Sequence, residues 1–167
     1  MTPLSTLLGG TEVAAWRLDL KKYASTWDSG EGAFKVGGRW NSKKTRVVYC
    51  SLDPATAILE VAVHKGFRTL DLVSHVLTSV TLTDLNQVHI VLPGDVPNPD
   101  WLHPGIPSAG QQQYGDDLLA THPFVLIPSV VSTFSWNLLF NPGMAAAKYS
   151  LRTQTAFALD TRLHPTA

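Results

Sequence analysis

The hydrophobic positions of the first third of the chain alternate in two short segments. In residues 14–20 (AAWRLDL) the even-numbered positions are all apolar, which predicts a strand. Residues 46–52 (RVVYCSL) predict a second strand, because the segment is rich in β-branched and aromatic residues. Its even-numbered positions from Val48 onward are apolar and should point to the core. Tyr49 and Ser51 share the opposite face, which therefore combines an aromatic ring with a hydroxyl group.

A helix is predicted directly after this second strand. Asp53 is suited to the N-cap and Pro54 to the first helical position, the apolar residues continue to about Lys65, and Gly66 ends the helix. Because the helix is apolar on almost every side, we expect it to be buried. A carboxylate in such a helix, Glu60, is costly to bury unless it is paired or used. A structural ion pair and a catalytic carboxylate facing a cleft are both open interpretations.

The remaining chain alternates short apolar runs with turn residues. The predicted elements are strands at 72–82, 88–92 and 124–132, a helix at 111–122 that Gly115 weakens, and a final strand at 156–160 that follows the segment NLLFNP. Residues 25–40 hold four glycines and are expected to be a loop, and residues 93–110 hold five prolines, which predicts a long irregular crossing. Strands separated by few, short helices favour the α+β class in one domain.

Composition narrows the class of protein. At 167 residues, with 44% hydrophobic and 16% charged residues, the chain is a single globular domain, and disorder and a coiled coil are excluded. Thirteen basic residues balance thirteen acidic ones, which argues against a general nucleic-acid or membrane-surface binder. A single cysteine, Cys50, excludes an intramolecular disulfide. No apolar run approaches membrane-spanning length and no signal peptide is recognisable, so a soluble cytoplasmic protein is expected.

The charge is unevenly distributed, with eight Lys and Arg against four Asp and Glu in residues 1–50. Basic residues flank the segment GGRWN, where Arg39 follows two glycines that allow the backbone to approach a ligand closely. An arginine in this position suits bidentate recognition of a phosphate, although an ordinary surface arginine has the same local sequence. Common nucleotide-binding, zinc-protease and hydrolase motifs are absent and the histidines are scattered, so no metal site is expected.

An ordered set of short segments resembles the RES domain family, which is named for its Arg, Glu and Ser. The segments are WRL around Arg17, GGRWN at 37–41, VVYCS at 47–51, AILEVAVH at 57–64, Pro128-Ser129, NLLFNP, and FALDTRL. The resemblance covers about residues 14–163. It includes spacings of ten residues from Arg39 to Tyr49 and eleven from Tyr49 to Glu60.

The resemblance implies that residues 1–167 form a single RES domain with a fold similar to ADP-ribosyltransferases. It further implies the toxin of a type II toxin–antitoxin system, with NAD+ as substrate and therefore without a metal or separate cofactor. Members of the family degrade NAD+ by cleaving the nicotinamide–ribose bond, or transfer ADP-ribose to a protein. The implied partner is an Xre-like antitoxin that contacts DNA, while the toxin itself binds neither DNA nor membrane.

The resemblance also assigns roles to individual residues. It implies that Glu60, Arg39 and Tyr49 are catalytic, with Glu60 opposing the positive charge that develops on ribose. Arg39 would clamp the pyrophosphate and Tyr49 would stack on the nicotinamide ring. Ser129 would form a hydrogen bond to the dinucleotide, and Arg17 belongs to the same substrate-binding motif.

Two positions depart from the family pattern. Met144 stands where relatives often carry a histidine after Asn-Pro, which leaves the acceptor open between water, phosphate and a protein. Leu118 stands where an aromatic residue is common, and this difference is expected to concern packing. No apolar run suggests a docking surface for a target protein, so degradation of free NAD+ is the primary expectation. A catalytically silent binding module is the rival interpretation, and the complete set of site residues argues against it.

Overall fold

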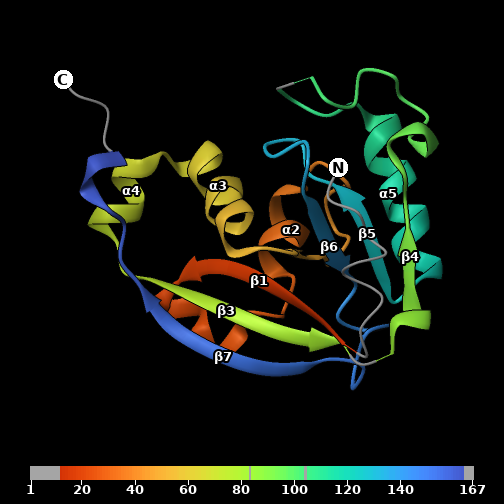
Figure 1. Cartoon of the computed structure of the whole chain (residues 1–167). Coiled ribbons are helices and arrows are strands. Elements are labelled where there is room, and N and C mark those ends of the chain that lie inside the picture. Colours follow the sequence, from red (N-terminus) through yellow and green to blue (C-terminus); the bar gives the residue numbers. More distant parts are fainter. Residues whose placement is uncertain (1–11, 83, 104, 164–167) are drawn as a thin grey trace.

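Seven strands form one strongly bent sheet in the computed structural model, which describes residues 12–82, 84–103 and 105–163 (Figure 1). Their order is β4-β5-β6-β2-β1-β3-β7. The pair β4 and β5 is parallel, and the other neighbouring pairs are antiparallel. The strands are β1 (Val13–Leu20), β2 (Val48–Ser51), β3 (His75–Leu82), β4 (Val88–Ile90), β5 (Phe124–Pro128), β6 (Trp136–Phe140) and β7 (Ser150–Phe157).

Helices cover the sheet at several places, and the predicted α+β class is confirmed. The α-helices are α2 (Glu31–Val36), α3 (Pro54–Lys65), α4 (Phe67–Leu72) and α5 (Ala109–Thr121), and the 3₁₀-helices are η1 (Lys21–Thr26), η2 (Leu85–Gln87), η3 (Pro93–Asp95) and η4 (Thr161–Leu163). In Figure 1, α3 lies over β1 near the middle of the molecule, and α5 lies beside β4 and β5.

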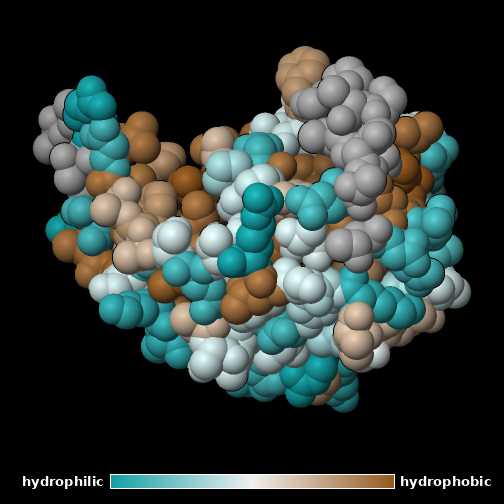
Figure 2. All heavy atoms as spheres, turned by 60° about the horizontal axis from the view of Figure 1, so that its bottom comes forward, coloured by the Kyte–Doolittle hydropathy of each residue, from teal (hydrophilic) through white to brown (hydrophobic). Residues whose placement is uncertain are grey.

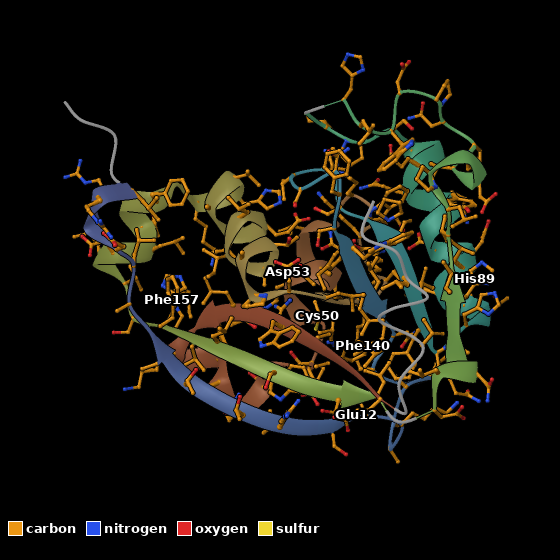
Figure 3. The ribbon with its side chains drawn as sticks, viewed as in Figure 1. Glu12, Cys50, Asp53, His89, Phe140 and Phe157 are labelled. Carbon is orange, nitrogen blue, oxygen red and sulfur yellow. The ribbon has the colours of Figure 1, made fainter. Side chains whose placement is uncertain are left out.

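The bend of the sheet brings β1 and β3 opposite β5 and β6 across one apolar cluster, which we call the inner cluster. Its buried members come from both halves of the sheet, for example Ala15 and Val80 on one side and Phe124 and Phe140 on the other. Figure 3 shows Cys50 and Phe140 in the region between the two halves. The prediction that the apolar face of β2 points to the core is therefore confirmed.

Two further clusters lie on the opposite, outer face of the sheet. One packs beneath α5 and includes Trp40, Leu119 and Leu139. The other packs beneath α3 and α4 and includes Leu18 and Leu70. Because side chains alternate along β2, Tyr49 and Ser51 point to this outer face, where the two clusters adjoin. The candidate site is therefore built on the outer face rather than in the inner core.

The helix after β2 begins as predicted, with Asp53 as N-cap and Pro54 in the first turn, and it ends at Gly66. The expectation that this helix is buried on almost every side is wrong. Its buried residues are Thr56, Ala57 and Ala62, whereas 60% of Val63 is exposed. One stripe of α3 packs on the sheet and the opposite apolar stripe faces solvent.

Several predicted boundaries also change. The expected loop at 25–40 contains the end of η1 and all of α2, and the expected strand at 72–82 begins only at His75, after α4. The segment NLLFNP, expected to be a connection, supplies most of β6. The last strand is β7, Ser150–Phe157, instead of 156–160. These boundaries depend on tertiary contacts that the local sequence does not report.

Helix α5 is confirmed, and Gly115 has a packing role that the sequence did not reveal. A Cβ atom on Gly115 would lie 2.0 Å from the carbonyl oxygen of Trp40. The helix backbone therefore lies directly against the GGRWN segment. The glycine reduces helix propensity, but it permits this close approach.

Strand β7 forms one edge of the sheet and pairs with β3 alone. Seven of its eight residues are exposed. Within the described part of the chain, no helix has the length and hydropathy needed to cross a bilayer. Over the same residues, no three His, Cys, Asp or Glu side chains gather closely enough to hold a metal ion.

Candidate active site

Glu60 lies on α3, which packs against β1 and β2, and its side chain reaches Ser129 after β5 and Asn137 in β6. The cap that starts the helix fixes its position, because Asp53 accepts hydrogen bonds from the Thr56 backbone N–H (2.7 Å) and hydroxyl (2.8 Å). The Ser135 hydroxyl also donates to Asp53, so the helix start is tied to the β5–β6 loop. Burial opposes ionisation of Asp53, but these hydrogen bonds outweigh it and lower its pKa. Figure 3 labels Asp53 at this point.

Two side chains donate hydrogen bonds to the same carboxylate oxygen of Glu60. The Ser129 hydroxyl donates to Oε1 over 2.9 Å, and the Asn137 amide Nδ2 donates over 2.5 Å. Among the described residues no hydrogen bond reaches Oε2. The side chain is half-buried. Glu60 therefore holds one oxygen fixed and leaves the other available, and the interpretation as a simple structural ion pair is not supported.

Ser129 stands at the end of β5, where the chain turns into the loop that leads to β6. Its side chain is fully buried. Besides donating to Glu60, its hydroxyl oxygen accepts the Ser132 backbone N–H over 3.1 Å. The Ser129 backbone N–H donates to the Ser135 carbonyl over 3.0 Å, which closes the loop. This geometry favours contact with Glu60 over direct contact with a dinucleotide.

Asn137 and Ser51 extend the hydrogen bonding beneath Glu60. Both are buried, with 6% and 2% exposed, and the Ser51 hydroxyl donates to Oδ1 of Asn137 over 2.8 Å. The residues are directly opposite each other in the β2–β6 pair. The sequence prediction missed Asn137, because NLLFNP was not assigned as a strand and so its faces were not considered.

Tyr49 presents a half-buried ring on the outer face, but its hydroxyl is held inside the protein. The hydroxyl donates to Oδ1 of Asn41 over 2.7 Å and accepts the Trp40 backbone N–H over 3.1 Å. Burial raises the pKa of Tyr49 far above its ordinary value, so the phenol is neutral. Tyr49 cannot act as a base there, and its exposed ring surface is the part available to a ligand.

The GGRWN segment is shaped around this tyrosine. A Cβ on Gly38 would lie 2.6 Å from both the Tyr49 hydroxyl and the Asn41 amide oxygen. Asn41 is fully buried and donates to the Ser42 carbonyl over 2.9 Å. Gln112 on α5 donates to the Gly38 carbonyl over 2.8 Å. The turn that carries Arg39 is therefore held from both sides.

Arg39 points toward the irregular segment between β4 and α5. Its Nη1 donates to the carbonyl oxygens of Trp101 (3.2 Å) and His103 (3.4 Å). Partial burial lowers the pKa of the guanidinium, although the nearby groups of Glu60 and Tyr49 oppose this shift. Among the ion pairs of the described residues, none joins Arg39 to Glu60. The cation is thus near the carboxylate without neutralising it directly.

Arg17 is placed differently from the other residues of the motif. Its guanidinium pairs with Asp19 through contacts of 2.5 and 3.0 Å, and its Nη1 donates to the Tyr49 carbonyl over 2.9 Å. Side chains alternate along β1 and Leu18 points to the outer face, so Arg17 points to the inner face. Burial raises the pKa of the Cys50 thiol there, and the positive charge of Arg17 opposes this rise. The structure therefore shows Arg17 bracing the backbone of β2, and does not bring it to the Glu60 cluster.

The two departures from the family pattern lie outside this cluster. Met144 follows the end of β6 that is remote from Asn137, and its neighbour Ala145 is buried in the inner cluster. Leu118 packs against the apolar cluster beneath α5, as expected for a packing difference. Met144 therefore carries no direct information about the acceptor.

The cluster unites side chains that are far apart in the sequence. Arg39, Tyr49 and Glu60 surround one region of the outer face, with Ser129 and Asn137 behind the carboxylate. A cation, an aromatic surface and a fixed carboxylate suit a ligand that carries phosphate, a flat ring and developing positive charge. The sequence did not reveal three features of this region, which are the contacts of Asn41, the contact of Asn137 with Glu60, and the hydrogen bond from Arg17 to the backbone of β2.

Comparison with known proteins gives concordant results. The RES domain matches residues 14–160. A protein named Toxin Res from Photorhabdus laumondii is 30% identical over 152 residues, covering 89% of this chain and 95% of that protein. A Prs ADP-ribosylating toxin from Sphingobium sp. is 32% identical over 140 residues, covering 80% and 84%. The crystal structure of the M. tuberculosis MbcT–MbcA toxin–antitoxin complex contains a chain of similar fold, with a TM-score of 0.70, 18% identity, and coverage of 88% and 85%.

Proposed function

The chain belongs to the RES domain family, and on this premise we propose that it is a toxin that degrades NAD+ by cleaving the nicotinamide–ribose bond. In this reaction the bonding electron pair leaves with nicotinamide, and the positive charge moves to the ribose. Water or phosphate then attacks the ribose, and its proton is released. NAD+ is the substrate, so the proposal requires no further cofactor.

The observation that carries the proposal is the way Glu60 is held. Ser129 and Asn137 both donate their hydrogen bonds to Oε1, which leaves Oε2 to face a ligand. A carboxylate fixed before substrate arrives stabilises positive charge without reorganising in the transition state. Arg39 then binds the pyrophosphate and the Tyr49 ring contacts nicotinamide. Ser129 acts through Glu60, and Arg17 acts through the backbone of β2.

The proposal is tested by incubating the purified protein with NAD+ and identifying the products by mass spectrometry. Catalytic release of nicotinamide together with ADP-ribose indicates hydrolysis. Appearance of phosphorylated ADP-ribose only when phosphate is added indicates phosphorolysis. Intact NAD+ with the purified protein, but ADP-ribose on a protein when cell lysate is supplied, contradicts the proposal.

Transfer of ADP-ribose to a protein is the second candidate function, and two observations favour it. One relative in the comparison is named as an ADP-ribosylating toxin. The sequence contains no apolar run that suggests a docking surface, but the fold exposes separate apolar side chains near the site. Leu59 and Val63 on α3 are exposed, as are Leu102 and Ile106 on the irregular segment that holds Arg39. These side chains flank the site and provide apolar contact area for another protein.

The same surface supports the proposal of an antitoxin partner, expected to be Xre-like. Figure 2 shows that the outline of the molecule is indented beside the lobe that contains α4. Ile106 is fully exposed and 45% of Leu102 is exposed, so both side chains offer apolar area to a partner. A partner bound across the indentation would cover these residues and block the site. A silent binding module would need this surface but not the prearranged Glu60.

A further inference from the structure

We infer that Asn137 is a positioning residue for Glu60 and that Ser51 keeps Asn137 in its working orientation. The inference rests on the proposed function for its catalytic consequence. Its structural part rests on three residues from β2, β6 and α3 that form a continuous chain of hydrogen bonds. Ser51 donates to Asn137, and Asn137 donates to Glu60.

The direction of this chain follows from the donor and acceptor capacities of its members. An ionised carboxylate only accepts, so the amide of Asn137 must present its NH₂ group to Glu60. The amide oxygen then points to Ser51, whose hydroxyl can donate to it over 2.8 Å. Because both residues are buried, rotation of the amide would leave polar atoms without partners, which is costly.

The chain of hydrogen bonds begins on the sheet, which makes it rigid. Ser51 and Asn137 are register partners in neighbouring strands, so their separation is fixed by the β2–β6 ladder. Glu60, in contrast, has a long side chain on a helix that is exposed on one side. With two donors on Oε1, the carboxylate cannot rotate freely and Oε2 keeps one direction. The proposed function requires that direction to face the ribose.

A matched control residue lies in the same row of the sheet. Trp16 is the register partner of Ser51 on one side and of Ser79 on the other. Ser79 is 4% exposed and its hydroxyl is 2.7 Å from that of Thr153. Ser79→Ala thus removes a buried hydroxyl and its hydrogen bond from the same sheet, without touching Glu60.

Kinetics of NAD+ cleavage provide the first test. Asn137→Leu is expected to lower kcat at least about 10-fold with KM changed less than about threefold, because the carboxylate loses its direction rather than its ligand contacts. Ser51→Ala lowers kcat in the same way, Ser51→Thr restores it by returning a hydroxyl, and Ser79→Ala leaves it unchanged. Equal effects of Ser51→Ala and Ser79→Ala on kcat would overturn the inference.

The variant Asn137→Asp supplies a pH readout that a purely structural role would not move. Two carboxyl groups so close share one proton over part of the pH range. In the singly protonated pair, the introduced carboxyl group can donate to Glu60 as the amide does, so kcat recovers toward acid pH. As pH rises and both groups ionise, repulsion displaces Glu60 and kcat falls. A pH profile with the wild-type shape contradicts the inference.

A measurement without NAD+ separates this inference from the proposed function. The side-chain amide protons of Asn137 are expected to shift in ¹H–¹⁵N spectra on Ser51→Ala and on Glu60→Gln, but not on Ser79→Ala. If these shifts are seen but the wild-type protein does not turn over NAD+, the chain of hydrogen bonds is supported and only the proposed function is contradicted. Asn137 resonances that are identical in the wild type and Ser51→Ala would overturn the inference whatever the turnover.

Discussion

The Glu60 carboxylate has one oxygen fixed by hydrogen bonds and one oxygen free. Substitution by glutamine keeps the shape of the side chain and removes its negative charge. Glu60→Gln can still accept the hydrogen bonds of Ser129 and Asn137, but it carries no charge to oppose the positive ribose. We expect NAD+ turnover to fall at least about 100-fold, measured as release of nicotinamide. Glu31→Gln is the matched control, since Glu31 pairs with Lys35 and Arg46 away from the cluster. Near-wild-type turnover of folded Glu60→Gln would falsify the catalytic assignment.

Substitution of Arg39 tests the binding of NAD+ separately from its cleavage. Its guanidinium reaches two backbone carbonyls and has further N–H groups for a ligand. A lysine keeps the charge but lacks the planar fork, so we expect Arg39→Lys to weaken NAD+ binding about 10-fold in calorimetry. Arg152→Lys, on the exposed strand β7, is the control and leaves the affinity unchanged. Equal affinity of Arg39→Lys and wild type argues instead for an ordinary surface arginine.

The residues of the candidate site differ in how far the sequence could point to them. Glu60 was identifiable because a carboxylate among apolar helix residues needs a reason, and Arg39 because it follows two glycines. Tyr49 required the family resemblance, since an aromatic residue in a strand is ordinary. Asn137 lay in a segment without an assigned strand, and a buried amide 77 residues from Glu60 leaves no local signal.

At the scale of elements, the contact between α5 and the GGRWN segment depends on one glycine. A Cβ on Gly115 would lie 2.0 Å from the Trp40 carbonyl oxygen, which is backbone and cannot move aside alone. We expect Gly115→Ala to lower the free energy of unfolding by about 1–3 kcal/mol or more in denaturant titrations. Gly32→Ala on α2 is the control. Its Cβ meets nothing within 4 Å, so improved helix propensity should leave stability equal or higher by up to about 1 kcal/mol. Equal losses in both variants would contradict the close contact.

The cap of α3 has a predicted pH dependence. Burial opposes ionisation of Asp53, but hydrogen bonds lower its pKa in the folded state. The contribution of ionised Asp53 to the free energy of unfolding is therefore complete at pH values above the ordinary pKa of an aspartate. It is lost as the pH falls through the pKa of Asp53 in the folded state. We expect Asp53→Ala to cost about 1–2 kcal/mol near neutral pH, and the difference from wild type to shrink in acid. Ser108→Ala removes the cap of α5 and should show no such pH dependence, because a hydroxyl does not ionise there. A constant cost of Asp53→Ala across the pH range would contradict this account.

Elements with strong local signals were predicted, and elements that depend on distant partners were not. Asp53 and Pro54 mark the start of α3 within the sequence itself. Strand β6 is five residues long and owes its place to β2 and β5 on either side. Gly66 correctly ends α3, but the chain continues at once into α4, a helix of six residues held by Leu70 in the cluster beneath it. Short elements of this kind are stabilised by packing rather than by propensity.

At the scale of the whole molecule, the balance of thirteen basic and thirteen acidic residues predicts weak interaction with nucleic acid. Binding to duplex DNA by counterion release needs several clustered cations, and here Glu31 pairs with two of the basic residues that flank GGRWN. We expect no binding of the isolated chain to duplex DNA at physiological salt in fluorescence anisotropy. DNA contact by the toxin–antitoxin complex would then come from the antitoxin. Tight binding by the isolated chain contradicts this allocation.

The wide sequence separation of the site has a consequence for the time at which activity begins. Glu60 precedes its donors Ser129 and Asn137 by 69 and 77 residues. A ribosome that adds ~5–20 residues per second needs roughly 4–15 seconds to cover that distance. During this interval the nascent chain contains the carboxylate without the groups that fix it, and β2 without its partner β6. On the proposed function, a toxin under synthesis is inactive until Asn137 has been added, which gives an antitoxin time to meet it as it folds.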